Sequence, residues 1–146
     1  MIFEYKGNNG RTSDGKSQIL INDLSNELYY CEDNNIVLKT ASSLPIQLSD
    51  CMFLRKKHRF ASWKFDQDGN EYAANDIVQL STSSAVNANW IRTFYFDVYQ
   101  NGSSQHGKAY LKLPYPSNDK RYDVNTVMHV IAEPANHYHL NSWRIF

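Results

Sequence analysis

The sequence has 146 residues, the size of one compact domain. Fifteen Lys and Arg residues balance fifteen Asp and Glu residues, so the composition indicates neither a globally basic nucleic-acid-binding protein nor an acidic mimic of one. Aromatic residues make up 14% of the chain, which excludes a disordered tail, and no apolar run reaches the length of about 18 residues that a membrane-spanning helix needs.

The first residues contain no apolar stretch of signal-peptide length, so we expect a cytoplasmic protein. Two segments are predicted as loops because glycine, proline and small polar residues dominate them, Gly7–Lys16 and Pro114–Asp123. No linker rich in proline or glycine divides the chain. We therefore expect a single β domain over residues 1–146.

Short segments rich in β-branched and aromatic residues predict about ten strands. Their spacing favours an antiparallel β-sandwich or jelly roll, with a closed β-barrel as the alternative. Two segments, Asp23–Tyr30 and Ser84–Trp90, contain enough helix-tolerant residues for a short helical turn. The predicted strands are Ile2–Tyr5, Gln18–Asn22, Leu28–Cys31, Ile36–Thr40, Cys51–Leu54, His58–Phe65, Asp76–Leu80, Ile91–Tyr99, Lys108–Leu113, Thr126–Ala132 and His137–Phe146.

Two hairpins are predicted from turn dipeptides. Asn101-Gly102 lies between the alternating strands Ile91–Tyr99 and Lys108–Leu113, and Asp68-Gly69 follows the strand His58–Phe65. Asp66–Glu71 also spaces oxygen side chains as a calcium loop does, but it lacks the EF-hand glycine and glutamate positions, so a turn is favoured. The residues expected in the core are Leu20, Ile36, Val78, Phe94, Phe96, Val98, Leu111 and Leu113.

Cys31 and Cys51 are the only cysteines, and their spacing fits no zinc motif. Two buried free thiols are favoured over a single disulfide, because free cysteine is among the most buried residue types.

A basic and aromatic segment forms the first candidate site. Five of the fifteen Lys and Arg residues lie within residues 55–64, with no carboxylate between Asp50 and Asp66. Interleaved charges and rings are typical of single-stranded nucleic-acid platforms. A solvated turn with buried rings is the alternative, and the zero net charge favours it. The residues concerned are Arg55, Lys56, Lys57, Arg59, Trp63 and Lys64.

Three histidines near the C-terminus form a second candidate. His137 and His139 would point the same way on a strand, and His129 could join them from a neighbouring strand. Such a set could bind a metal ion, or act as acid and base in hydrolysis aided by Arg144 or Lys112. Glu133 is the one nearby carboxylate, so an ordinary polar face is favoured and no cofactor is expected.

Three tyrosines form the third candidate. In the Asn101-Gly102 hairpin, Tyr95, Tyr99 and Tyr110 would share the face opposite the core and form an aromatic strip. Planar rings with a polar tip stack on sugars and anchor protein interfaces. A covering layer of protein over the same rings is the alternative.

The absence of familiar catalytic signatures favours a non-enzymatic recognition domain that binds a protein or glycan partner through the tyrosines. Inhibitors, immunity proteins and phage-encoded binders are proteins of this kind. A histidine-dependent hydrolase or nuclease is one alternative, and a single-stranded nucleic-acid binder is the other. A second copy of the chain could also pair at an exposed sheet edge.

Overall fold

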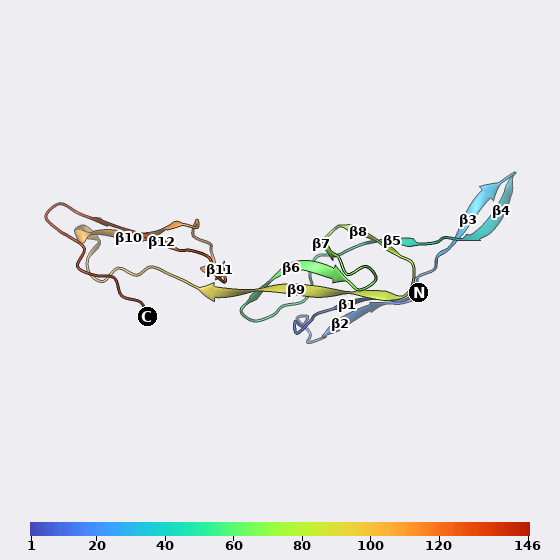
Figure 1. Ribbon diagram of the computed structural model, residues 1–146, viewed down its shortest axis with the longest axis horizontal. Coiled ribbons are helices and arrows are strands. Elements are labelled where there is room, and N and C mark those ends of the chain that lie inside the picture. Colours follow the sequence, from blue (N-terminus) through green and yellow to red (C-terminus); the bar gives the residue numbers. More distant parts are fainter. The chain divides into compact units, whose positions relative to one another are not determined.

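The computed structural model describes residues 1–146 and confirms the all-β class, with 47% of the residues in strands and 2% in helix (Figure 1). Its sheets are antiparallel or mixed, as in a β-sandwich, and none closes into the alternative barrel. It contains no helix of the length and apolarity that a membrane crossing requires. The contacts divide the chain into two compact units, residues 1–91 and 92–146, and each is described by itself.

The first unit carries most of the strands. They are β1 (Phe3–Lys6), β2 (Gln18–Ile21), β3 (Glu27–Glu32), β4 (Asn35–Thr40), β5 (Leu44–Gln47), β6 (His58–Phe65), β7 (Glu71–Tyr72), β8 (Ile77–Leu80) and β9 (Ser84–Tyr95), whose last four residues belong to the second unit. The second unit adds the short 3₁₀ turn η1 (Ser104–His106), β10 (Gly107–Leu113), β11 (Arg121–Asp123) and β12 (His129–Pro134).

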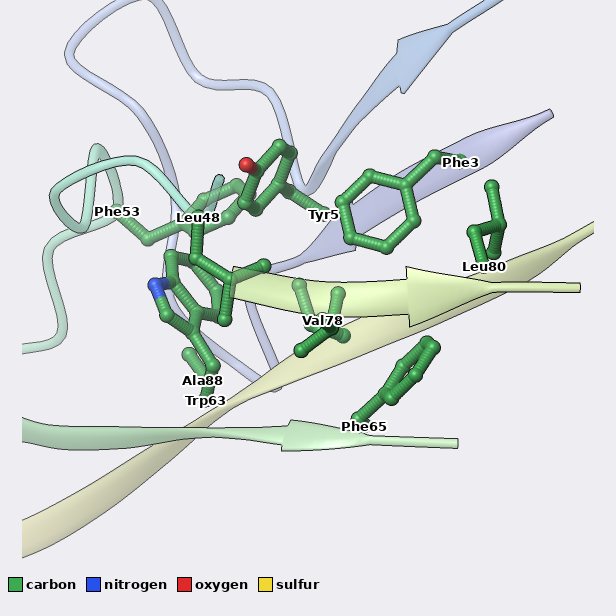
Figure 2. Close-up of a cluster of buried hydrophobic side chains, with 10 residues drawn as sticks. Phe3, Tyr5, Leu48, Phe53, Trp63, Phe65, Val78, Leu80 and Ala88 are labelled. Atoms are coloured by element: carbon green, nitrogen blue, oxygen red, sulfur yellow. The ribbon is translucent and has the colours of Figure 1, made fainter. Parts of the chain in front are cut away.

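The main sheet has the order β2-β1-β9-β6-β7, with β1 parallel to β9. Alternating side chains of β1, β6 and β9 meet those of β8, which pairs with β5 in a separate two-stranded sheet (Figure 2). Burial of apolar side chains from two sheets makes this the core of the first unit. Its largest fully buried side chains are Phe3, Leu48, Phe53, Trp63, Phe65, Leu80 and Val86.

The hairpin at Asp68-Gly69 is confirmed. β6 pairs with β7 through Trp63 and Tyr72, and Gly69 adopts a φ of 72°, which glycine reaches without strain. The Asp68 carboxylate accepts hydrogen bonds from the Asn70 backbone N–H and the Tyr72 hydroxyl. The segment Asp66–Glu71 therefore forms a turn, which is the interpretation that its sequence favoured over a calcium loop.

The hairpin predicted at Asn101-Gly102 is wrong. β9 ends at Tyr95 and pairs with β11, while β10 pairs with β12. The backbone N–H of Phe96 donates to the carbonyl of Lys120, so the chain segment before β11 takes the partner position that β10 was expected to fill. Competition between two neighbouring segments for one strand edge is not visible in a local alternation pattern.

The predicted core is correct at Val78 and Leu111, whereas Phe94, Phe96 and Val98 are half-buried. Leu20, Ile36 and Leu113 are exposed, for three different reasons. Leu20 pairs with Glu4, on the face of β1 away from Phe3 and Tyr5. Ile36 lies in the β3–β4 hairpin, outside the core, and the β10–β12 register shifts between Leu111 and Leu113, which breaks the alternation.

Two predicted strands are absent. Cys51–Leu54 contributes only one isolated bridge, between Leu54 and Arg11, and His137–Phe146 forms no strand. The two segments considered for helical turns contribute instead to strands β3 and β9.

Candidate functional site

Residues 92–146 contain a groove of about 790 Å³, which we call the C-terminal groove. This volume lies within the range of about 300–1,000 Å³ that is usual for ligand sites. It is lined by the paired strands β10 and β12, by the segment between β9 and β10, and by the segment after β12. Side chains that line it include Tyr99, Asn101, His106, Lys108, Glu133, Tyr138, His139, Asn141, Trp143, Arg144 and Phe146.

The rings of Tyr99, Tyr138, Trp143 and Phe146 line this groove and remain accessible to a ligand. Tyr99 is 71% exposed, and Tyr138 and Trp143 are each about half exposed. The ring of Tyr138 stacks on that of His106, with centroids 4.4 Å apart, so the imidazole covers one face of the Tyr138 ring. Exposed rings of this kind supply contact area at little cost in side-chain entropy.

A charged network fixes the polar part of the groove. Glu133 accepts a hydrogen bond of 2.8 Å from the Tyr110 hydroxyl and forms an ion pair of 3.2 Å with Lys108. The hydroxyl and the ammonium hold the pKa of the Glu133 carboxyl below its ordinary value of 4.5. The same hydrogen bond raises the pKa of Tyr110. Glu133 is therefore an ionised acceptor at neutral pH.

A second cluster surrounds Tyr99. The hydroxyls of Tyr95 and Tyr99 lie 3.4 Å apart, and this contact raises the pKa of Tyr99. Between them in sequence, Asp97 accepts a hydrogen bond of 2.6 Å from the Lys120 ammonium. That ammonium lowers the pKa of Asp97, and the carboxylate in turn raises the pKa of Lys120. Tyr95, Tyr99 and Lys120 are exposed, whereas Asp97 is half-buried.

The three predicted tyrosines do not form one strip. Tyr95 and Tyr99 contact each other at the end of β9, but Tyr110 lies on β10, in a different sheet, because the expected hairpin does not form. Tyr110 is half-buried and does not line the C-terminal groove, but it contacts two residues that do, through its hydrogen bond to Glu133 and the Lys108 ammonium over its ring. Tyr99 lines the groove directly.

The predicted basic segment precedes and enters β6. Residues 55–58 form a turn in which the His58 backbone N–H donates to the Arg55 carbonyl, and Lys57 adopts a φ of 62°. Lys56, Lys57 and Lys64 are exposed, as expected. Arg59 is exposed as well and donates a hydrogen bond to the Phe60 carbonyl.

The aromatic ring of Trp63 is buried, whereas a nucleic-acid platform requires exposed rings. Trp63 is 0% exposed and packs edge-on against Tyr5 and Phe53 in the core, where its indole N–H donates to the Ser49 carbonyl. A base needs an open ring face for stacking, and Trp63 offers none. The lysines of this segment are thus exposed, and Trp63 and Phe65 lie in the core, whereas Phe60 is half-buried.

A second pocket, of about 490 Å³, lies beside this turn, and we call it the β6 pocket. Its floor is apolar, with Phe53, Phe60 and Trp90, and its rim is basic, with Arg55 and Lys56. Trp90 is held by a hydrogen bond of 2.8 Å from its indole N–H to the Gly7 carbonyl. A Cβ atom at Gly10 would lie 2.4 Å from this ring, so glycine is required there.

The three predicted histidines are not brought together. His129 begins β12 opposite Leu113, whereas His137 and His139 follow its other end, after Pro134. The strand alone separates those ends by about 16 Å. His137 adopts a φ of 70° and neither it nor His139 lies in a strand, so the strand geometry from which their shared orientation was predicted is absent. No group of three or more potential metal ligands gathers within residues 1–146.

The two cysteines are free, as favoured, but Cys31 is exposed and Cys51 half-buried. Burial raises the pKa of the Cys51 thiol. The expectation that both thiols are buried fails at Cys31, because it lies on the exposed β3–β4 hairpin.

The residues that sequence reasoning missed in the C-terminal groove are Tyr138 and Trp143. Both fall in the segment 137–146 that was predicted as a strand, and the aromatic and amide side chains that gather in this segment of the sequence are the signal that points to them. Comparison of the chain with protein-family models, with curated proteins and with solved structures gives no match.

Proposed function

We propose that the protein is a non-enzymatic recognition domain that binds a glycan in the C-terminal groove. The observation that carries the proposal is the combination of side chains along this groove. The groove is lined both by accessible rings, those of Tyr99, Tyr138 and Trp143, and by hydrogen-bonding groups such as Asn101 and Glu133.

This combination matches the chemistry of a sugar. A pyranose has an apolar face of C–H groups that packs on an aromatic ring, and a rim of hydroxyls that needs both donors and acceptors. The ionised Glu133 carboxylate supplies an acceptor, and the Arg144 guanidinium and Asn141 amide supply donors. A protein partner is the other class of ligand, but the groove is concave and half polar, whereas protein hot spots favour desolvated apolar pockets.

Binding of the full-length protein to an array of immobilised oligosaccharides tests the proposal. We expect a defined subset of glycans to bind, and Tyr99→Ala to weaken that binding about tenfold or more, since loss of a contacting aromatic ring costs roughly 2 kcal/mol. Tyr115→Ala is the matched control, because Tyr115 lies in the same unit, is 86% exposed and does not line the groove. Circular dichroism checks that both variants fold.

Two results would refute the proposal. One is an array on which the wild-type protein retains no glycan. The other is a glycan that the Tyr99→Ala and Tyr115→Ala variants bind equally well.

A further inference from the structure

The β3–β4 hairpin has an apolar face that nothing in its own unit covers. Its two-residue loop, Asp33-Asn34, has φ values of 48° and 64°, as a tight hairpin turn requires, and the strands pair in regular antiparallel register. All the strand residues are exposed except the half-buried Val37. An isolated two-stranded hairpin is marginally stable in water, so this one needs a further surface to pack against.

The two faces of the hairpin differ. On one face Lys39 lies over the Tyr30 ring and pairs with Glu32, so the hairpin covers part of that face itself. The other face has no such cover. It presents Ile36 at 80% exposure and Tyr29 at 75%, next to Leu38. This second face is an apolar patch, which on a soluble protein marks an interaction site.

The charges of the hairpin are complementary to those of the β6 pocket. Residues 27–40 carry three carboxylates and one lysine, and neither Glu27 nor Asp33 has an ion-pair partner. The rim of the β6 pocket carries Arg55 and Lys56. Lys56 has no carboxylate within ion-pair distance. Opposite potentials on two surfaces favour their encounter and fix their register.

We infer that the apolar face of the β3–β4 hairpin docks into the β6 pocket of a second copy of this chain. Ile36 and Tyr29 then pack on Phe53, Phe60 and Trp90, which form the floor of that pocket. The acidic loop at Asp33 meets its basic rim. Because hairpin and pocket are different surfaces of one chain, two copies can exchange hairpins reciprocally and close a dimer. This inference concerns residues 1–91 and does not rest on glycan binding.

Light scattering after gel filtration of the full-length protein, over a range of concentrations, tests the inference. The mass should rise above the 16.9 kDa of one chain as the concentration increases. Ile36→Asp should raise the dissociation constant about tenfold or more. Ile77→Asp is the matched control, because Ile77 is 59% exposed in the same unit but belongs to neither surface, and it should leave the dissociation constant unchanged.

Charge reversal identifies the paired surfaces. Asp33→Lys alone and Lys56→Asp alone should each weaken association, and the double variant should restore it, because each copy then carries both reversed charges. Alkylation of Cys31, which shares the docking face, should slow as the concentration rises. A chain that stays monomeric at every concentration overturns the inference. So does an equal effect of Ile36→Asp and Ile77→Asp, or a double variant that associates no better than the single ones.

Discussion

Trp63 is the side chain whose replacement tests the described core most sharply. Trp63→Phe removes part of a fully buried ring and also the indole N–H that donates to the Ser49 carbonyl at 3.0 Å. The Ser49 carbonyl is part-buried, and the loss of its hydrogen-bond partner costs about 1–3 kcal/mol, to which the partial loss of ring volume adds about 1 kcal/mol. We therefore expect a loss of about 2–4 kcal/mol in the free energy of unfolding.

Urea unfolding followed by far-UV circular dichroism measures this loss. With a slope of about 2 kcal/mol per molar urea, the midpoint should fall by about 1–2 M. Trp143→Phe makes the same chemical change at a half-exposed ring and should cost no more than about 0.5 kcal/mol. Equal midpoints for the two variants would refute the placement of Trp63 in the core and would reopen its role as a stacking surface.

Three further predictions concern the hydrogen bond of Glu133, the exposure of the two cysteines and the backbone conformation of Gly69. Tyr110→Phe should raise the pKa of Glu133 toward its ordinary value of 4.5, which an NMR titration of the carboxyl carbon measures, and an unchanged pKa would contradict the hydrogen bond. Because the folded-state pKa is lowered, the stabilisation from this network is present above about pH 4.5 and is lost as the pH falls through the folded-state value. In dilute protein, iodoacetamide should modify the exposed Cys31 before the half-buried Cys51, whose pKa is raised. Peptide mass spectrometry measures the order of modification, and the reverse order would contradict the placement of the two thiols. Gly69→Ala should cost about 1–2 kcal/mol in thermal unfolding through backbone strain alone, since no atom lies near the added Cβ and the φ is 72°. An unchanged melting temperature would show that this turn has another conformation.

Local pattern predicts the strands of this chain well, but not their partners. The alternation in β8 places Val78 inside and Ile77 outside, because side chains on a strand alternate strictly between faces. The tight Asp68-Gly69 turn is predictable because the dipeptide encodes the backbone conformation that the turn needs. The pairing of β9 with β11 depends on which of two later segments reaches the strand edge, and no local signal records that competition.

The candidate site shows the same division. The exposure of Tyr95 follows from its alternation with Phe94 and Phe96. Tyr99 is exposed as well, but it lies beyond the end of β9, so strand alternation does not account for it. The role of Tyr110 as the partner of Glu133 depends on the pairing of β10 with β12, which sequence did not predict. The run of Lys and Arg residues in the sequence predicts the basic turn before β6. Sequence does not show that Trp63 faces the core and Phe60 a pocket, because this depends on how the strands pack.

The indole N–H signals of the three tryptophans test glycan recognition in the C-terminal groove most directly. Trp143 lines that groove, Trp90 lines the β6 pocket and Trp63 lies in the core, so each signal reports on a different place. In an NMR titration with a glycan retained on the array, we predict a shift of the Trp143 signal alone. A shift confined to Trp90, or no indole shift at saturation, would contradict binding in the groove.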